Sequence, residues 1–406
     1  MYPRTLQIPG AAGQGFFLFG PRGTGKTTWL KQRFPAAIYL DLLDHALYLE
    51  LLARPQRLRD LIPPRHDGWV VLDEVQRTPL VLNEVHRLIE EAGRRFILTG
   101  SSARSLRRRG VNLLGGRART YRLYPLTASE TGADFSLQRA LVHGQLPSVY
   151  TQPDPDNYLA SYVENYLRQE VIEEGRTRNL AAFSRFLESA SFSQAAPLNV
   201  AQVARDVGVD RKTAAAYFDL LEDLLIASRV PVFARRAKRR VTVHPKFYLF
   251  DAGVYRAIRP SGPLDSPEEI DGAALETLVY HELRAAIAYR SLKLELFFWR
   301  TAAGAEVDFV AYGGDGLFAI EVKRSRTVRS SDLRGLRQFR SDYPMARCML
   351  LFGGDRREYR DGIDLLPVAD ALADPASVLT APGDADAPAR ASTRARRSGL
   401  AGRPQG

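Results

Sequence analysis

A glycine-rich segment near the N-terminus has the residue types and spacing needed to bind phosphate. Residues 20–27 match G-x-x-x-x-G-K-[ST] at every fixed position, after four apolar residues and before a helical pattern. The glycines let backbone N–H groups and the helix N-terminus face a phosphate closely. We expect Lys26 to reach the β- and γ-phosphates of ATP and Thr27 to ligate Mg²⁺. An ordinary glycine-rich turn is the alternative, and both motif and context favour the phosphate loop. The predicted nucleotide-binding residues are Gly20, Gly23, Thr24, Gly25, Lys26, Thr27, Thr28 and Asp73.

Two carboxylates follow the apolar run 69–72. Asp73 would hold the Mg²⁺ through water, and Glu74 would polarise the water that attacks the γ-phosphate. An Asp-Glu pair also begins many helices. Its position after a complete phosphate loop favours the catalytic interpretation.

Two further residue types fit phosphoryl transfer. Ser101 or Ser102, at the end of the apolar run 96–99, is a candidate sensor that orients the water; a plain strand-to-loop exit is the alternative. Arg117 is a candidate arginine finger, acting on its own site or on a neighbouring subunit. Because only seven of the 57 basic residues are lysine, an arginine can also stand there by chance.

A second group of charged residues lies in the C-terminal part. Asp308 and Glu321 follow D-(x)₁₂-E-x-K with Lys323, and Glu276 comes from a preceding helical pattern. Residues two apart in a strand share a face, so Glu321 and Lys323 should lie together. Asp308 and Glu321 would bind Mg²⁺, and Lys323 would activate water or stabilise a phosphate. A surface hairpin with solvated charges is the alternative.

A basic region between these groups has helix-turn-helix spacing. Short helices are predicted on either side of 207–209, with Asp210 as an N-cap. Strands 230–233 and 241–243 would then flank a basic hairpin tip, as in a winged helix. Such a unit contacts DNA phosphates or serves only for packing. The candidate nucleic-acid contacts are Arg211, Lys212, Arg235, Arg236, Lys238, Arg239 and Arg240.

Three units should position these residues. Residues 1–125 alternate apolar runs at 16–19, 37–41, 69–72, 96–99 and 119–123 with helical patterns. This alternation predicts an α/β fold with a parallel sheet of about five strands, a P-loop NTPase domain. Residues 126–260 read as a helical and winged-helix-like region, in which 157–174 forms one amphipathic helix with an aromatic core stripe. Residues 261–370 form a small α/β domain with strands 296–300, 306–310 and 317–323, and the tail 371–406 is predicted to be disordered.

Composition limits the classes of protein. The chain has 406 residues, 45% hydrophobic and 25% charged, with no apolar run near a membrane span and no secretory segment, so we expect a cytoplasmic protein. Cys348 is its only cysteine, which excludes disulfide scaffolds and cysteine zinc sites. A net charge of +11 favours an acidic partner such as DNA, although an arginine-rich coding bias gives the same total.

The chain resembles the prokaryotic AAA-superfamily ATP-binding proteins whose C-terminal domain of unknown function is similar to PD-(D/E)xK nucleases. The resemblance covers residues 10–370 and implies ATP binding and hydrolysis with Mg²⁺, without a settled biological role. Asp251 fits the pattern, but we derive no role for it from the sequence. The motifs that carry the resemblance are residues 20–27, 72–74, 98–102, 114–117, 124–126 with Glu130, 246–248, 251–253, 298–301, 304–309 and 320–323.

Three functions stay open at this point. In the first, the chain is an ATPase that remodels or moves along DNA, and its nuclease-like domain binds or cuts the DNA. Alternatively, it is a nucleotide-gated signalling or stress-response switch that self-associates with ATP and binds protein. The third alternative is a nucleotide-binding regulator with slow hydrolysis. Stimulation of hydrolysis by DNA, or ATP-dependent self-association without DNA, distinguishes these alternatives.

Overall fold

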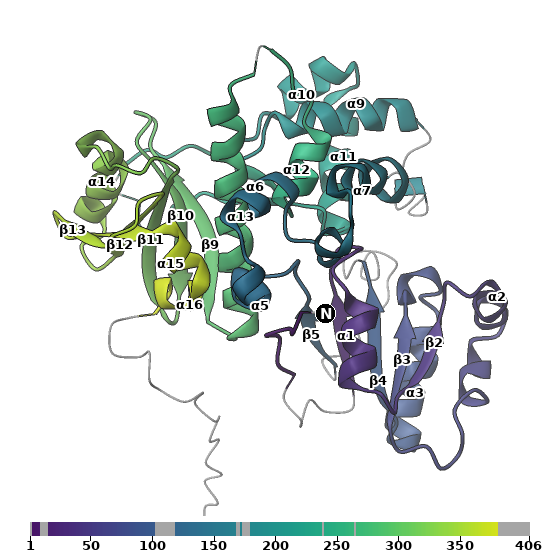
Figure 1. Ribbon diagram of the computed structural model, residues 1–406. Coiled ribbons are helices and arrows are strands. Elements are labelled where there is room, and N and C mark those ends of the chain that lie inside the picture. The colour runs from purple at the N-terminus through teal and green to yellow at the C-terminus, as the bar shows by residue number, and fades with distance from the viewer. Residues whose placement is uncertain are drawn as a thin grey trace, which may run out of the picture.

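A five-stranded parallel sheet forms the N-terminal domain. In the computed structural model its strand order is β2-β3-β4-β1-β5, and every neighbouring pair is parallel (Figure 1). Each strand overlaps one that the apolar runs predicted, so the predicted α/β fold class is confirmed. The elements are β1 Gly15–Phe19, α1 Lys26–Arg33, β2 Ile38–Asp41, α2 His45–Ala53, β3 Trp69–Asp73, α3 Val81–Ala92, β4 Arg95–Gly100 and β5 Ala118–Arg122, with 3₁₀ turns at Pro55–Arg59 and Val75–Arg77.

The structure describes residues 2–8, 15–101, 118–167, 171–172, 179–237, 239–263 and 265–380. Three candidate residues, Ser102, Arg117 and Lys238, lie outside the described residues. Within these ranges no helix is long and apolar enough to cross a membrane.

The middle region consists of short helices around a small antiparallel sheet. Its strands follow the order β6-β8-β7. The expected pair of helices is present. Helix α10 ends at Val207, and its C-cap residue Gly208 has a left-handed φ of 73°. The Asp210 side chain caps α11 by accepting from Lys212 N and Thr213 N. The elements are α5 Ala128–Thr131, α6 Leu137–His143, α7 Pro155–Ser161, α9 Leu180–Ser191, β6 Ala196–Pro197, α10 Val200–Val207, α11 Arg211–Asp223, β7 Ala227–Val230, β8 Lys246–Leu249 and α12 Ala252–Ile258, with 3₁₀ turns at Gly132–Asp134 and Pro147–Thr151.

Two predictions for this region are corrected. The helix expected over 157–174 begins at Pro155 and changes to π-helical geometry over Tyr162–Leu167. The strands expected at 230–233 and 241–243 do not pair with each other. Val232 instead bridges Phe298 and Val241 bridges Thr301, because the edge of the C-terminal sheet offers unpaired backbone groups to both segments.

The C-terminal domain is a mixed six-stranded sheet of order β13-β14-β12-β11-β10-β9. It contains the three predicted strands and three more, and the long helix α13 lies between it and the middle region (Figure 1). The elements are α13 Pro267–Tyr289, β9 Leu294–Arg300, β10 Glu306–Gly313, β11 Gly316–Lys323, α14 Arg334–Asp342, β12 Arg347–Phe352, β13 Glu358–Arg360, β14 Ile363–Pro367, α15 Val368–Ala373 and α16 Pro375–Val378, with a 3₁₀ turn at Ser330–Leu333.

The predicted tail begins too early. Residues 371–380 include the end of α15 and all of α16. They are folded because Leu372, Val378 and Leu379 are buried in the core that includes α13. Residues 381–406 lie outside the described residues.

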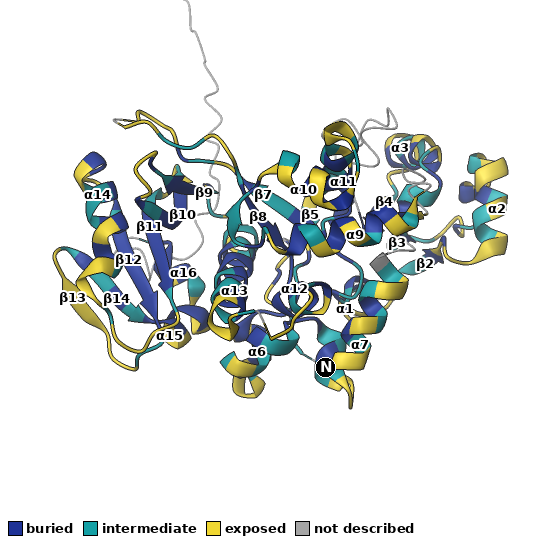
Figure 2. Cartoon of the chain, turned by 90° about the horizontal axis from the view of Figure 1, so that it is seen from above, coloured by how far each residue is buried: buried dark blue, intermediate teal, exposed yellow. Residues whose placement is uncertain are grey.

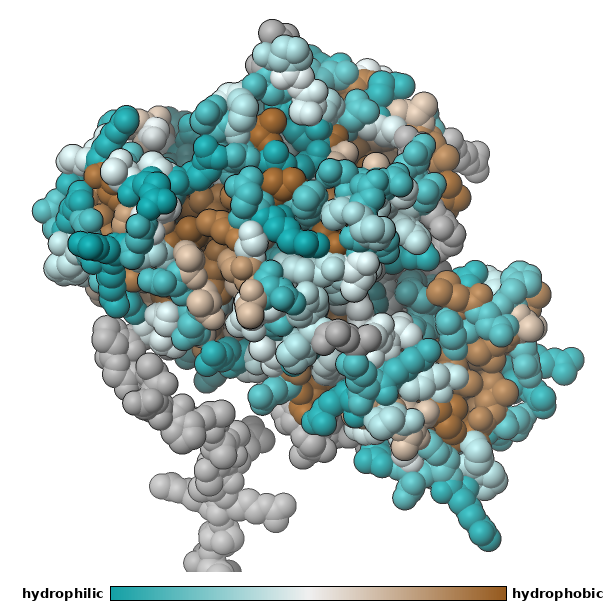
Figure 3. Space-filling model, in the orientation of Figure 1, coloured by the Kyte–Doolittle hydropathy of each residue, from teal (hydrophilic) through white to brown (hydrophobic). Residues whose placement is uncertain are grey.

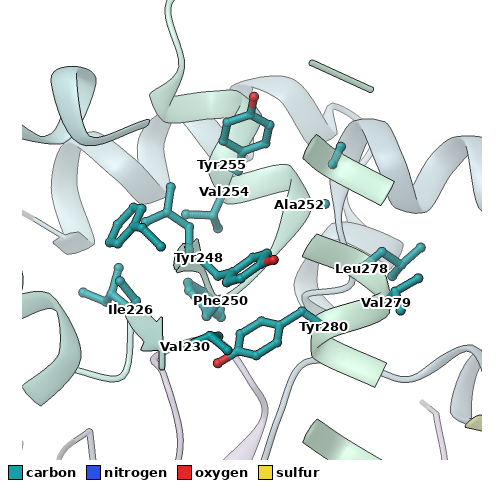
Figure 4. Close-up of a cluster of buried hydrophobic side chains, with 14 of the residues drawn as sticks. Ile226, Val230, Tyr248, Phe250, Ala252, Val254, Tyr255, Leu278, Val279 and Tyr280 are labelled. Atoms are coloured by element: carbon teal, nitrogen blue, oxygen red, sulfur yellow. The ribbon is translucent and has the colours of Figure 1, made fainter. Parts of the chain in front are cut away.

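Burial shows how the units join. The inner strands of both large sheets are buried, whereas the edge strands β5 and β13 and the outer faces of the helices carry exposed residues (Figure 2). One continuous apolar core runs from α9 and α11 through β8 and α12 to α13 and the facing side of the C-terminal sheet; Figure 4 shows its centre, around Tyr248, Phe250 and Tyr280. The middle and C-terminal units are therefore packed as one body across residue 260.

The surface seen in Figure 3 is largely hydrophilic, with hydrophobic residues gathered over the C-terminal sheet and over the N-terminal domain. In this domain Leu49 and Leu52 of α2 and the preceding Leu43 are exposed.

Candidate functional site

The phosphate loop connects β1 to α1, as expected. Gly20 lies against the neighbouring strand exit so closely that a Cβ there would be 2.3 Å from the Leu123 carbonyl oxygen. Gly23 and Gly25 have φ values of 85° and 83°, which side chains rarely adopt, so both positions require glycine. The Thr24 hydroxyl is buried and donates to the Pro21 carbonyl at 2.9 Å, whereas Thr28 is exposed on α1.

Lys26 is buried within this loop. Its ammonium donates to the carbonyl oxygens of Gly20 at 2.7 Å and Pro21 at 3.3 Å. These neutral carbonyls offer no charge to neutralise the ammonium, so a phosphate oxygen would be a stronger acceptor. The arrangement suits a loop that closes on a phosphate.

Thr27 and Asp73 lie side by side. The Thr27 hydroxyl at the start of α1 donates to Asp73 Oδ2 at 2.6 Å, and Thr99 from β4 donates to Asp73 Oδ1. Strand β4 lies between β1 and β3, which brings Thr99 to this point. A hydroxyl and a buried carboxylate are hard oxygen donors of the kind that Mg²⁺ prefers, so this pair fits the expected ion.

Glu74 has an unusual backbone conformation. Its φ of 57° and ψ of 45° are left-handed, which is uncommon for a residue other than glycine and typical of functional sites. Its carboxylate accepts from the Gln76 amide, and the same amide donates to Ser101 Oγ at 3.2 Å. Gly100 leaves room for this amide, since a Cβ there would lie 2.2 Å from Gln76 Oε1. Gln76 thus joins the candidate base to the candidate sensor.

The middle region covers the loop. The Tyr162 hydroxyl donates to the Arg22 carbonyl at 2.9 Å, and the Arg22 guanidinium lies 4.6 Å from the centre of the Tyr166 ring. A Cβ on Gly23 would be 3.4 Å from Tyr162, and one on Gly25 would be 3.7 Å from Pro147. The predicted aromatic stripe is indeed part of the core, and it also forms one wall beside the loop.

Helix α13 contacts the chain where it leaves the N-terminal domain. Its Tyr289 hydroxyl accepts from Tyr124 N at 3.0 Å, and its Glu282 accepts from Ala128 N at 2.7 Å. His281 lies 3.0 Å from the Leu126 carbonyl; burial lowers the pKa of His281 to about 4, so the neutral ring donates this bond. These bonds fix the C-terminal domain to the segment that follows β5.

Two of the four predicted C-terminal residues, Glu276 and Asp308, contact an unexpected lysine. Lys246 Nζ lies 2.8 Å from Glu276 Oε1, 2.6 Å from Glu306 Oε1 and 3.0 Å from Asp308 Oδ1. Lys323 pairs with Glu321 at 2.5 Å on the same face of β11, as predicted.

Charges in this cluster strongly affect one another. Burial disfavours the charged form of Lys246, but Asp308 and Glu276 outweigh it and raise the pKa of this ammonium well above its ordinary value. Burial, and then the charge of Asp308, raise the pKa of Glu276 to about 7. Burial and Asp308 likewise raise the pKa of Glu321, whereas Lys246 and Lys323 outweigh burial at Asp308 and lower its pKa.

The predicted C-terminal Mg²⁺ is not supported by this donor set. Among the described residues no group of three or more histidines, cysteines, aspartates or glutamates is arranged to hold a metal ion. Asp308 Oδ1 faces Lys246, and Asp308 Oδ2 accepts from Val322 N at 3.0 Å. The Asp308 oxygen that faces the cluster is therefore already paired with a buried ammonium.

The candidate DNA contacts are separated into two places. Arg211 and Lys212 are exposed at the start of α11. Arg235 and Arg239 lie instead beside the end of α14, where Arg239 pairs with Asp342 at 2.8 Å and the Tyr343 hydroxyl donates to the Arg235 carbonyl at 3.0 Å. Arg235, Arg236 and Arg240 are exposed.

Sequence reasoning missed several residues of both sites. Lys246 could have been found from the sequence. Lysine is rare in this arginine-rich chain, and the same rarity marked Lys26 and Lys323. Gln76, Thr99, Tyr162 and Glu306 had no comparable signal, since each acquires its role from a contact with a distant element.

Comparisons with known proteins agree with this arrangement. Residues 13–132 match the family described as "AAA domain", residues 134–265 a domain of unknown function (DUF8612) and residues 271–371 a domain of unknown function (DUF4143). The N-terminal unit is thus an AAA-type domain. The Lys246 cluster includes residues from both of the other matches.

The similar whole proteins are themselves uncharacterised. The chain is 26% identical to the uncharacterised proteins Mb2031c of Mycobacterium bovis and Rv2008c of Mycobacterium tuberculosis, over 91% of this chain and 81% of each relative. A solved structure, the Signal Transduction ATPase with Numerous Domains (STAND) protein with a tetratricopeptide repeat sensor PH0952 from Pyrococcus horikoshii, is 13% identical with a TM-score of 0.20. That alignment covers 71% of this chain and 48% of the other, so the chain spans about half its length. A likeness this weak carries no argument.

Proposed function

We propose that this chain binds ATP with Mg²⁺ in the phosphate loop and hydrolyses it. The observation that carries the proposal is the bond of 2.6 Å between the Thr27 hydroxyl and Asp73, next to a buried Lys26. The match of residues 13–132 to an AAA domain supports the same chemistry.

Each residue has a separate task in this proposal. Lys26 binds the β- and γ-phosphates, and Thr27 and Asp73 hold the Mg²⁺, which neutralises phosphate charge when bound. Glu74 orients the attacking water and accepts its proton. Gln76 positions Glu74 relative to Ser101, because its amide donates to both side chains.

Two variants test the proposal, with ATP affinity and ATP turnover measured separately. Lys26→Ala should abolish ATP binding or leave it very weak, because it deletes the cation aimed at the phosphates. Glu74→Gln should keep binding and lose turnover. Lys31→Ala, on the exposed face of the same helix, is the matched control and should change neither value. Wild-type turnover by Glu74→Gln would contradict the assignment of the base.

The nucleotide state would reach the rest of the chain through two contacts. One is the hydrogen bond between Tyr162 and the loop at Arg22. The other is the set of hydrogen bonds between α13 and the segment after β5. This supports a nucleotide-gated switch, in which the C-terminal domain binds a partner without cutting nucleic acid.

DNA is the second candidate partner. Arg211 and Lys212 support it, because both are exposed at the N-terminal end of α11, the second helix of the predicted winged helix. Hydrolysis measured with and without DNA separates the two candidates: stimulation favours DNA remodelling, whereas ATP-dependent self-association without DNA favours the switch.

A further inference from the structure

A lysine side chain fills the centre of the C-terminal carboxylate cluster. An ammonium group has three N–H donors. The Lys246 ammonium lies within 3.0 Å of three carboxylates, from Glu276, Glu306 and Asp308, and donates hydrogen bonds to Glu276 and Asp308. One buried cation therefore pairs with all three carboxylates.

This cation comes from a different unit than the carboxylates. Lys246 begins β8 of the middle region, whereas Glu276 belongs to α13 and both Glu306 and Asp308 belong to β10. The Lys246 side chain is only 1% exposed, and its ammonium lies 5.7 Å from the centre of the Phe298 ring. The ion pairs therefore fix β8 to the C-terminal sheet from within.

Aromatic residues close the cluster on the side of the core. The Tyr248 hydroxyl donates to the same Glu276 oxygen that Lys246 contacts. The Tyr248 ring stacks on Tyr280 of α13 with ring centres 4.5 Å apart, and both rings are visible in Figure 4. The carboxylate of Glu276 is thus held in place from two directions.

Three carboxylates this close repel one another unless a cation lies between them. A protein meets this requirement with a bound metal ion or with a basic side chain. Mg²⁺ would need carboxylate oxygens at about 2.1 Å in the same small space. The ammonium already occupies the point that all three carboxylates face, so the two cations exclude each other.

We propose that Lys246 is a built-in cation that takes the place of a divalent metal ion in this cluster. The cluster then holds the middle and C-terminal units together without any metal, and the wild-type domain does not cleave phosphodiesters by a metal-dependent route. The proposal is independent of the proposed ATPase, because it concerns residues of another domain.

Direct measurement of Mn²⁺ binding tests it. Nucleotide-free wild type, Lys246→Ala and Lys246→Ala/Asp308→Asn are titrated with Mn²⁺ and the free ion is followed by electron paramagnetic resonance. Any weak binding at Thr27 and Asp73 is common to all three proteins and cancels. Lys246→Ala should bind Mn²⁺ at least about tenfold more tightly than wild type, since a positive charge in contact has been removed. The double variant should lose this gain, and Lys293→Ala, an exposed lysine before β9, should behave as wild type.

Two results would overturn the proposal. One is binding of Mn²⁺ by the wild type that Asp308→Asn removes, because the metal would then displace the lysine. The other is a folded Lys246→Ala that gains no affinity for Mn²⁺. If Lys246→Ala does not fold, the wild-type and Asp308→Asn titrations decide alone. Equal, weak binding by both supports the proposal, and a difference between them overturns it.

Discussion

The hydroxyl of Tyr162 donates a hydrogen bond of 2.9 Å to the backbone carbonyl of Arg22, a residue 140 positions earlier within the phosphate loop. Tyr162 is 1% exposed and begins the π-helical turn that follows α7. Such turns often occur at functional sites. The bond gives the middle region a direct contact with the loop that would bind ATP.

The first prediction concerns this bond. Tyr162→Phe should lower the stability of the protein by about 1 kcal/mol, since it leaves the Arg22 carbonyl without this donor. ATP affinity should change by up to about fivefold, which is the factor that corresponds to the free energy of this hydrogen bond if all of it affects the loop that binds ATP. Thermal unfolding and titration with a fluorescent nucleotide measure the two effects. Tyr166→Phe keeps an aromatic ring beside Arg22 and is the control; equal effects of both variants would contradict a specific role for the Tyr162 hydroxyl.

The second prediction concerns Gln76 as a positioning residue. Gln76→Ala should reduce kcat about tenfold, part of the roughly 10²–10⁴ that a positioned base contributes, while ATP affinity stays unchanged. Steady-state kinetics and equilibrium binding separate the two. Gln32→Ala on α1 should alter neither. A loss of affinity that matches the loss of kcat would show that Gln76 acts through stability of the loop instead.

The third prediction concerns Arg117, which lies outside the described residues. If Arg117 acts on a neighbouring subunit, Arg117→Ala should be inactive alone, and mixing it with Glu74→Gln should restore turnover. Each mixed interface can then combine an intact arginine with an intact base. Turnover is measured across mixing ratios at constant total protein. If no ratio restores turnover, Arg117 either acts on the site of its own subunit or has no catalytic role.

The fourth prediction concerns DNA. The exposed Arg211 and Lys212 should contribute a salt-dependent affinity, with a slope of log K against log salt of about 0.9 for each phosphate neutralised. The double variant Arg211→Ala/Lys212→Ala should therefore reduce the slope by about 1.8 in binding titrations at several salt concentrations. Arg185→Ala, an exposed arginine of α9, should leave it unchanged. Binding that does not vary with salt would remove DNA from the partners.

The fifth prediction concerns pH and Asp251, for which the sequence offered no role. Its carboxyl caps α12 by accepting from Val254 N at 3.0 Å and also accepts from Gln145 N at 2.7 Å. Burial raises its pKa to about 6 from the ordinary aspartate value of 3.8. The protonated form is therefore favoured by folding, and the stability it contributes is complete below pH 4 and is lost as pH rises through 6.

Chemical unfolding at several pH values measures this effect. Relative to Asp251→Asn, which does not titrate, wild type should lose about 1 kcal/mol between pH 5 and pH 7. The Asn variant should also be less stable at pH 5, because its amide replaces one of the two acceptor oxygens with a donor. A stability difference that is constant with pH would show that Asp251 does not titrate in this range.

Elements whose cause is local could be predicted from the residues alone. The alternation of apolar runs with helical patterns fixes the five parallel strands, and the spacing from Gly20 to Thr27 fixes a loop that only glycines at 23 and 25 allow. Asp210 was recognisable as a helix cap because a cap contacts its own helix two and three residues later. The positions of Asp73 and Glu74 at the end of a buried strand follow from the same local pattern.

Contacts between distant residues could not be predicted in this way, because they form only when the whole chain folds. Lys246 and Asp308 are 62 residues apart, and nothing in their local sequence states that the ammonium lies among three carboxylates. The basic segment 235–240 looked like a free hairpin tip, but the residues on either side of it bond to β9 and to the residues that follow β9. The aromatic stripe around Tyr162 was predicted to belong to the core. Packing also places the Tyr162 hydroxyl against the phosphate loop. Such contacts join distant elements, and their free energy depends on burial and charge that exist only once the chain has folded.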